Sequence, residues 1–363
     1  MGAKATMLDV AKSAGVALGT VSNHLNGSVH VSPKTAKKID RAIMRLGYRI
    51  HLGARSLRAQ RTQSVGLVVP NISNPFYAEV ARAVEHSLWE RGFQTLLCDS
   101  SQDAERERKH LDSLENRRVD GILLIHWDRP PRERLQRMTV PVVCVDRVVE
   151  GQLSVTTNNQ LGGRLAARHL VAQGHRRFAI LAGQPTDNNV RERLRGFMAV
   201  LGEQEGLEKP QVLTGPEQAI ELGYEVGRLL DGGRAAPTAL FATNDIVAVG
   251  AWRSLLELGI RIPQDMSLVG YDDIEMTRLL IPPLTTVAQD KTALAREATA
   301  VLLRVLDGDK GGKERERPVQ IPPRLIVRGS TASPSNARAG SSMARRPEGR
   351  KSRKGAAMRP QVA

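Results

Sequence analysis

Short apolar runs alternate with segments of helical periodicity through most of this chain. Seven such runs cover residues 65–69, 94–98, 121–125, 142–145, 178–181, 240–242 and 267–269. The helical segments between them end at Trp89 or cover residues 105–116, 161–173, 190–203 and 246–258. Apolar strands joined through helices are typical of a parallel sheet that is covered on both faces. Because the pattern occurs twice within 363 residues, it predicts an α/β core of two parallel-sheet lobes.

Polar side chains follow the ends of these predicted strands. Carboxylate, guanidinium and amide groups are found at Asp146, Arg193, Asn244 and Asp272. Ligands of open α/β sheets bind beyond the carboxyl ends of the strands, and this set of donors and acceptors suits a polyhydroxylated molecule. The alternative is that each residue is only a solvated loop residue.

The first 58 residues have a different pattern. Residues 6–27 read TMLDVAKSAGVALGTVSNHLNG, in which the helical apolar spacing breaks at residues 14–16 and then resumes. Two short helices joined by a turn that contains Gly form a helix-turn-helix, whose second helix is sized for the DNA major groove. Ser32 and Pro33 are expected to open a third helix that runs to about Leu46. The sequence therefore predicts an all-α headpiece that binds DNA.

The net charge of +15 is concentrated at the two ends of the chain. Residues 1–60 hold ten Lys and Arg against Asp9 and Asp40, and residues 331–363 hold eight against Glu348. The 270 residues between them carry 35 charges of each sign. The head therefore has the charge that a phosphate backbone attracts. The final segment has no apolar period and is expected to be a disordered basic tail, which either adds non-specific DNA affinity or has no function.

Several classes of protein are disfavoured by what the sequence lacks. No apolar run reaches the roughly 20 residues of a membrane helix, and the N-terminus has no signal-peptide core, so we expect a cytoplasmic protein with no membrane partner. Cys98 and Cys144 are too few for a disulfide framework. Because phosphate-binding, hydrolase and zinc motifs are missing, we expect no cofactor, no metal and no enzyme activity.

Residues 6–58 resemble the headpiece of the LacI/GalR family of bacterial transcriptional regulators. The resemblance depends on the pattern D-V-A-x-x-A-G-V-x-x-x-T-V-S-x-x-L-N-G and on Gly47-Tyr48. Residues 62–330 resemble the family's core, itself like periplasmic sugar-binding proteins, through stretches such as NISNPFYAEV, FATNDIVAVGA and SLVGYDD. The resemblance implies a homodimeric repressor of double-stranded operator DNA, controlled by a small sugar-like effector bound between the two lobes.

The same resemblance implies which residues contact DNA. The family's base-reading positions correspond to Leu18, Gly19 and Asn23. Its backbone-contact positions correspond to Thr20, Ser22, Asn26, His30, Thr35 and Tyr48. Thr6, the expected N-cap of the first helix, is a further candidate, and His24 either donates to DNA or is a solvated helix residue. The family usually has Arg at the position of Asn23. Arg reads guanine whereas Asn reads adenine, so we expect the operator sequence to differ from the family's usual one.

Residues 50–61 correspond to the family's hinge helix and linker. Leu57 matches the Leu that the family inserts into the minor groove, and Ala54 matches the small residue beside it. Ile50-His51 stand where the family has Pro-Asn, and Gly53 lies inside the helix, where Gly costs about 1 kcal/mol relative to Ala. A flexible basic linker is the alternative.

The family's effector contacts correspond to Asp146, Arg193, Asn244 and Asp272, with Phe76 as a wall of the site. An aromatic residue that stacks on sugar in some members corresponds to Gln218, so that platform is absent. Trp127 either replaces it or packs in the core. The family's usual Asp-Asn pair is Asn158-Asn159 here.

These expectations define a domain layout and a function. The head covers residues 1–49, the hinge and linker 50–61, the core 62–330 and the tail 331–363. The N-lobe is expected at about 62–158 and 289–320, and the C-lobe at about 159–288 and 321–330. The alternative function, a solute-binding protein of sugar transport, would require a signal peptide and no basic head. An enzyme on the same core would need a nucleophile–base motif that the sequence lacks.

Overall fold

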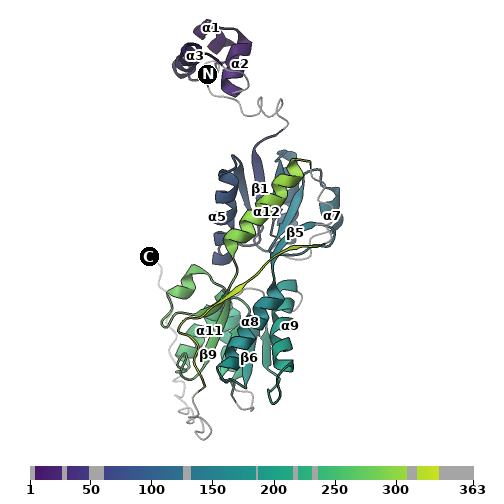
Figure 1. The fold of residues 1–363 in the computed structure, drawn as a ribbon, viewed down its shortest axis with the longest axis vertical. Helices are drawn as coiled ribbons and strands as arrows, with labels where there is room; N and C mark the ends of the chain where they lie inside the picture. The colour runs from purple at the N-terminus through teal and green to yellow at the C-terminus, as the bar shows by residue number, and fades with distance from the viewer. Residues whose placement is uncertain are drawn as a thin grey trace, which may run out of the picture. The chain divides into compact units, whose positions relative to one another are not determined.

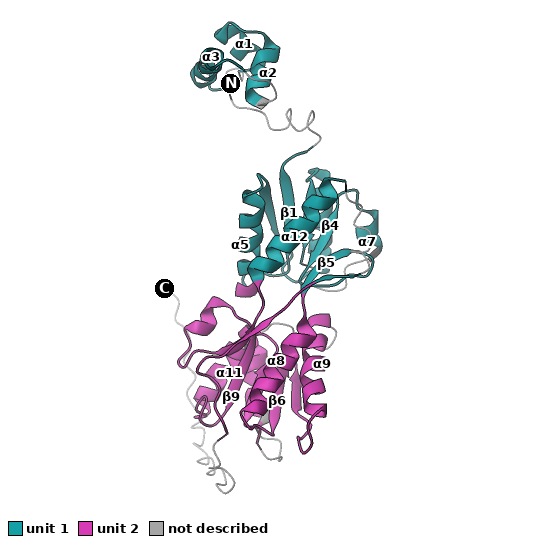
Figure 2. Ribbon diagram, in the orientation of Figure 1, with its two compact units in different colours: residues 1–73, 77–156, 291–319 teal, residues 74–76, 157–290, 320–363 magenta. Residues whose placement is uncertain are grey.

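The computed structural model describes residues 5–26, 31–48, 61–125, 132–184, 187–215, 220–230, 236–308 and 317–334 (Figure 1). The chain divides into two compact units (Figure 2). Unit 1 comprises residues 1–73, 77–156 and 291–319, and unit 2 comprises residues 74–76, 157–290 and 320–363. Residues 5–48 of unit 1 form a helical head, and we call its part from residue 61 onward the N-lobe. We call unit 2 the C-lobe.

The head consists of three helices, α1 (Met7–Ala14), α2 (Leu18–Asn26) and α3 (Pro33–Leu46). Thr6 and Asp9 form a capping box at the start of α1, and Ser32 caps α3 by accepting from the backbone N–H of Thr35. Gly15 and Gly47 end α1 and α3 in the left-handed conformation that Gly adopts without steric cost. The helices enclose one small core, made by Val10, Ala11, Ala14, Val21, Ile39, Ala42 and Tyr48.

The N-lobe is built on a six-stranded sheet with the order β11-β5-β4-β3-β1-β2. Its strands are β1 (Ser64–Val69), β2 (Gln94–Asp99), β3 (Gly121–Leu124), β4 (Val142–Val145), β5 (Leu153–Thr157) and β11 (Val319–Ile321). Its helices are α5 (Pro75–Trp89), α6 (Ala104–Asn116), α7 (Arg132–Arg137) and α12 (Lys291–Leu306). The pairs that β1 forms with β2 and β3, and β4 forms with β3 and β5, are all parallel.

The C-lobe repeats this design with the order β12-β10-β9-β8-β6-β7. Its strands are β6 (Phe178–Ala182), β7 (Gln211–Thr214), β8 (Ala239–Ala242), β9 (Ser267–Asp272), β10 (Thr285–Ala288) and β12 (Arg324–Ile326). Its helices are α8 (Asn159–Ala172), α9 (Asn188–Gly202), α10 (Ile220–Tyr224) and α11 (Asp245–Glu257), with short 3₁₀ helices at Glu225–Leu229 and Glu275–Arg278. Only the β10–β12 pair, among the pairs described for this sheet, is antiparallel.

Both faces of the C-lobe sheet are buried, which explains the continuous apolar strands. Along β6, Ala179 and Leu181 belong to one hydrophobic cluster, whereas Phe178 and Ile180 belong to another. Since successive strand residues point to opposite faces, each face of the sheet has its own core. The predicted architecture of a helical head and two parallel-sheet lobes is confirmed.

The sequence pattern did not predict β5, β7, β10, β11 or β12, nor the helices α7, α10 and α12. The sequence of β10 reads Thr-Thr-Val-Ala, and all four residues are buried. Its hydroxyl groups are satisfied inside the lobe, since Thr286 Oγ1 donates to Asp245 Oδ1 at 2.7 Å and Thr285 Oγ1 accepts from the N–H of Arg328. A search for apolar runs overlooks a buried strand whose polar atoms are paired in this way.

The first residues of the predicted tail contact the C-lobe. Thr331 and Ala332 were assigned to it, but they are bonded to the C-lobe. The Ala332 carbonyl lies 2.9 Å from His175 Nε2, and the Ala332 N–H donates to Ser267 Oγ at 3.0 Å. His169 Nε2 lies 2.9 Å from Thr331 Oγ1. Polar groups rather than apolar side chains attach this segment to the C-lobe. Its composition therefore does not distinguish it from the tail that follows.

Candidate DNA-binding and effector-binding sites

The first turn of α2 presents no polar side chain until Thr20. Ala17, Leu18 and Gly19 are exposed, with 46% of the Leu18 surface accessible, and the space where a Gly19 side chain would stand is open. Asn23 lies one turn beyond Gly19, and residues four apart share a helix face. Gly19 and Asn23 therefore share one face of α2, and Leu18 is the first residue of the same helix.

His24 lies beside Asn23 in sequence but is engaged within the head. Its Nε2 is 2.7 Å from Oδ1 of Asp40 on α3, and the His24 side chain is only 20% exposed. Val21, one turn before Leu25, is fully buried in the head core. These contacts fix α2 against α3 through its inner side, and they give His24 a structural role that its sequence position did not reveal.

The remaining DNA-contact candidates differ in exposure. Thr6 is exposed, Thr20 and Thr35 are half-buried, and Ser22 and Tyr48 are each 9% exposed. Asn26 is the last residue of α2. Three further candidates, His30, Ala54 and Leu57, lie outside the described residues. The DNA contacts of all these residues stay predictions.

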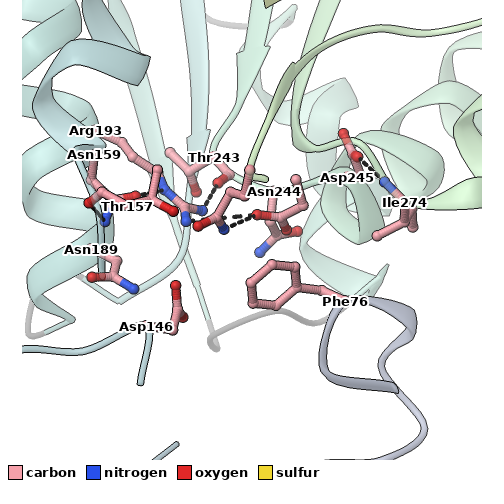
Figure 3. Close-up of polar contacts among 12 residues, drawn as sticks. Phe76, Asp146, Thr157, Asn159, Asn189, Arg193, Thr243, Asn244, Asp245 and Ile274 are labelled. Atoms are coloured by element: carbon pink, nitrogen blue, oxygen red, sulfur yellow. Dashed lines mark hydrogen bonds and ion pairs between the residues drawn. The ribbon is translucent and has the colours of Figure 1, made fainter. Parts of the chain in front are cut away.

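The C-lobe contains a buried polar network centred on Arg193, a residue of α9 that is 5% exposed (Figure 3). Its Nε donates to Asn159 Oδ1 at 2.8 Å, and its Nη1 donates to the Thr243 carbonyl at 2.5 Å. Its Nη2 lies 3.6 Å from Asp272 Oδ1, and the guanidinium carbon lies 3.7 Å from the centre of the Tyr271 ring. The guanidinium is therefore held in one orientation by partners on several elements.

Close packing of two helices brings Arg193 to its partners. A Cβ built on Gly163 of α8 would overlap the Arg193 carbonyl, and one built on Gly196 of α9 would overlap the Gln160 carbonyl. Only Gly lets the two backbones approach this closely. The approach lets Arg193 on α9 reach Asn159, the first residue of α8.

The end of β9 is the second part of the network. Asp272 and Asp273 have positive φ angles, 111° and 52°, which non-Gly residues seldom adopt. Such backbone strain persists where the surrounding structure enforces it, and it concentrates at functional sites. Asp272 is 6% exposed, and its Oδ1 accepts from Gln289 Nε2 at 2.7 Å. The strain points the Asp272 carboxylate at donors from two other segments.

Asp245 stabilises the turn after β9 through hydrogen bonds. It is fully buried at the start of α11, accepting from the Ile274 N–H at 3.0 Å and from the Thr286 hydroxyl. Burial raises the pKa of Asp245 well above its ordinary value, and the negative charge of Asp272 raises it further. Asn244, before it, caps α11 by accepting from the Val247 N–H at 2.8 Å. Asp245 thus positions the turn that carries Asp272. The Asn244 side chain, which was predicted to bind effector, caps α11.

The other predicted effector residues lie in different parts of the chain. Phe76, near the start of α5, is 3% exposed and belongs with the C-lobe unit, together with Asn74, whose Oδ1 accepts from its N–H. Asp146 follows β4 in the N-lobe, is 2% exposed, and has a positive φ of 64°. Trp127 lies outside the described residues. The effector role of each stays a prediction.

Sequence reasoning did not select Asn159, Tyr271 or Gln289 as site residues. Gln289 follows β10, whose polar sequence concealed the strand and therefore the strand end. Asn159 was noticed only as half of an unusual Asn-Asn pair. Tyr271 sits inside an apolar run, and nothing in the sequence distinguishes a core aromatic from one that supports a guanidinium.

Comparisons with known proteins match both parts of the chain. Residues 6–50 match the model for bacterial regulatory proteins of the lacI family, and residues 167–331 match a periplasmic binding protein-like domain. The chain is 37% identical to the ribose operon repressor of Escherichia coli over 90% of this chain and 99% of that protein. It is 36% identical to the transcriptional repressor PurR of Haemophilus influenzae over 91% of this chain and 99% of that protein.

Two solved structures extend the comparison. A Lac repressor dimer bound to operator and an anti-inducer superposes with a TM-score of 0.80 at 28% identity, covering 91% of this chain and 100% of that one. A lacI-family regulator from Enterococcus faecium with bound ribose gives a TM-score of 0.67 at 30% identity, covering 75% of this chain and 100% of that one. The relatives named here are transcriptional regulators rather than enzymes. Among the helices described, none is long and apolar enough to cross a membrane.

Proposed function

Because the chain belongs to the lacI family of bacterial regulatory proteins, and is thus a DNA-binding transcriptional regulator, we propose that it represses transcription under the control of a sugar-like effector. The head binds operator DNA and the core binds the effector. The effector changes operator affinity only to the extent that it binds two states of the protein with different affinities. Since its target is chromosomal DNA, the protein acts in the cytoplasm.

The observation that carries the effector proposal is the held orientation of Arg193. A guanidinium fixed by Asn159 and the Thr243 carbonyl, with the Asp272 carboxylate near it, offers both donors and acceptors at one place. Vicinal hydroxyl groups donate and accept at once, so a sugar satisfies both kinds of group. The ribose bound to the Enterococcus faecium regulator supports the same ligand class.

A homodimer is the second element of the proposal. The Lac repressor is a dimer on its operator, and paired half-sites require two heads. The C-lobe of this chain exposes Leu279 and Ile281 at 77% and 89%, and Met276 at 41%. Neighbouring exposed apolar side chains of this size are typical of a subunit contact. We assign this group, Met276, Leu279 and Ile281, to the dimer interface.

The transport alternative is disfavoured by the head. A helical head with an excess of positive charge has no role in a solute-binding protein, and the head matches the regulatory family's own model. The match of residues 167–331 to a periplasmic binding protein-like domain describes the ligand-binding core that such regulators share.

The experiment is footprinting of the DNA upstream of this gene and its neighbours, with pentoses, hexoses and nucleosides added in turn. We expect a protected pseudo-palindrome and one compound that alters protection. In Arg193→Lys the charge remains but the planar fork of donors is lost, so the response to that compound should fall by at least tenfold while basal operator binding persists. Arg195→Lys, on the same helix with a 57% exposed side chain, is the control. Absence of any protected palindrome would refute the function.

A further inference from the structure

Two consecutive aspartates at the end of β9 have partners in different parts of the C-lobe. Asp272 belongs to the network around Arg193, where its Oδ1 accepts from Gln289 Nε2 at 2.7 Å. Asp273 instead pairs with Arg328, whose Nη2 lies 2.5 Å from Asp273 Oδ1, and the two side chains are only 14% and 11% exposed. Because the two aspartates share one planar peptide unit and both have positive φ angles, a rotation at Asp272 also displaces Asp273.

Arg328 holds the segment that follows the two aspartates. Its Nη1 donates to Thr277 Oγ1 at 3.1 Å and to the Leu284 carbonyl at 2.8 Å. Thr277 is fully buried, and its carbonyl accepts from the Leu284 N–H at 2.9 Å. We call residues 274–284 the β9–β10 connection. One guanidinium therefore binds Asp273 just before this connection, Thr277 within it and Leu284 at its end.

The β9–β10 connection carries the exposed apolar group that we assign to the dimer interface, namely Met276, Leu279 and Ile281. The strand before it, β9, ends at Asp272, and the strand after it, β10, ends just before Gln289. Both of these residues belong to the effector network. The proposed subunit contact is therefore joined at each end to a strand that brings a side chain to the effector site.

We propose, on the basis of the proposed function, that Arg328 is a positioning residue that couples the effector site to the dimer contact. A displacement of the Asp272 carboxylate, by an effector or by loss of its partners, moves Asp273. The guanidinium of Arg328 passes this movement to the β9–β10 connection and its apolar group. Couplings between two sites commonly change an equilibrium constant by about 5- to 150-fold. By reciprocity, the dimer and the monomer bind the effector with different affinities.

The test measures the dimer dissociation constant of the full-length protein, without DNA, by fluorescence-detected sedimentation. Ile281→Ala is the common background, because trimming a side chain of the proposed contact brings dissociation into the measurable range. Asp272→Ala removes the carboxylate from its partners and should raise the dissociation constant by about fivefold or more, although Asp272 is only 6% exposed. When Arg328→Gln is also present, Asp272→Ala should change the dissociation constant by less than about twofold.

Arg324→Gln is the matched control, since it removes the same charge from an exposed position on β12. In its presence Asp272→Ala should keep its full effect. Gln289→Ala removes only one hydrogen bond from Asp272, so it replaces Asp272→Ala if that variant does not fold. Asp273→Ala likewise interrupts the coupling if Arg328→Gln does not fold. Circular dichroism and Trp252 fluorescence report whether each variant is folded.

The possible failures are distinguishable. If the wild type is a monomer, or if Ile281→Ala leaves its dimer unchanged, the proposed dimer contact fails and the coupling fails with it. If Ile281→Ala weakens the dimer but Asp272→Ala has no effect, or the same effect with and without Arg328→Gln, only the coupling is overturned. The coupling is also overturned if Arg324→Gln abolishes the effect of Asp272→Ala as fully as Arg328→Gln does.

Discussion

Removal of Arg193 should destabilise the C-lobe far more than removal of its exposed neighbour on the same helix. Asp272 is only 6% exposed, and in Arg193→Ala its carboxylate loses the positive charge beside it. The Thr243 carbonyl also loses the hydrogen bond that Arg193 donates. Breaking a buried ion pair by deleting one partner costs about 3–5 kcal/mol, because an uncompensated charge remains. Arg195→Ala breaks a pair with Glu192 that is half exposed, for which about 0–1 kcal/mol is expected.

The measurement requires a signal from the C-lobe alone, because two lobes need not unfold together. The chain has three Trp, of which Trp252 is 4% exposed in the C-lobe core. With Trp89 and Trp127 replaced by Phe, urea unfolding followed by fluorescence reports on Trp252. We expect Arg193→Ala to lower the unfolding free energy by at least 3 kcal/mol. Adding Asp272→Asn should recover part of this loss, since the stranded carboxylate is then gone.

Two results would refute this reasoning. If Arg193→Ala and Arg195→Ala shift the urea midpoint equally, the network does not stabilise the lobe. If the losses from Arg193→Ala and Asp272→Asn simply add in the double variant, the two groups do not interact despite lying 3.6 Å apart.

Three further predictions concern the hinge, the N-lobe and the dimer. Leu57→Ala, outside the described residues, should weaken specific DNA binding far more than non-specific binding; equal losses in a competition assay would mean that Leu57 is no wedge. Hydrogen bonds from Arg134 and Thr139 lower the pKa of Glu115 to about 2, so its contribution to stability is complete above its ordinary pKa and is lost as pH falls toward 2. Glu115→Gln should therefore flatten the acid limb of a stability–pH curve, and an unchanged limb would contradict the assignment. Ile281→Asp should yield monomers in sedimentation, whereas an intact dimer would exclude the interface assigned to this face.

The sequence alone predicted the secondary structure wherever apolar periodicity and local capping residues determine it. The head was predictable because Thr6, Ser32 and Gly47 are local signals whose partners lie within a few residues. The strands of each lobe were predictable only where their sequence forms an apolar run. Strand β10 was not, because its Thr side chains meet partners from residues 245 and 328, far away in sequence.

The same limit applies to the sites. Arg193 and Asp272 were selected from their places at the ends of strands and helices, and the structure shows that they lie in one network. Asn159 and Gln289 complete that network from segments that gave no signal of their own. For His24, the sequence left DNA contact and a solvated position equally open. The structure instead shows a contact with Asp40, sixteen residues away, which cannot be predicted from the position of His24 on its helix.

The packing of α2 determines which of its residues can be substituted without loss of the folded head. Val21 and His24 hold the helix from its inner side, while Leu18, Gly19 and Asn23 take no part in the described core of the head. We therefore expect substitutions of Leu18 and Gly19 to leave the packing of α2 against α3 intact. Related regulators can therefore differ at these two exposed positions and keep the same folded head.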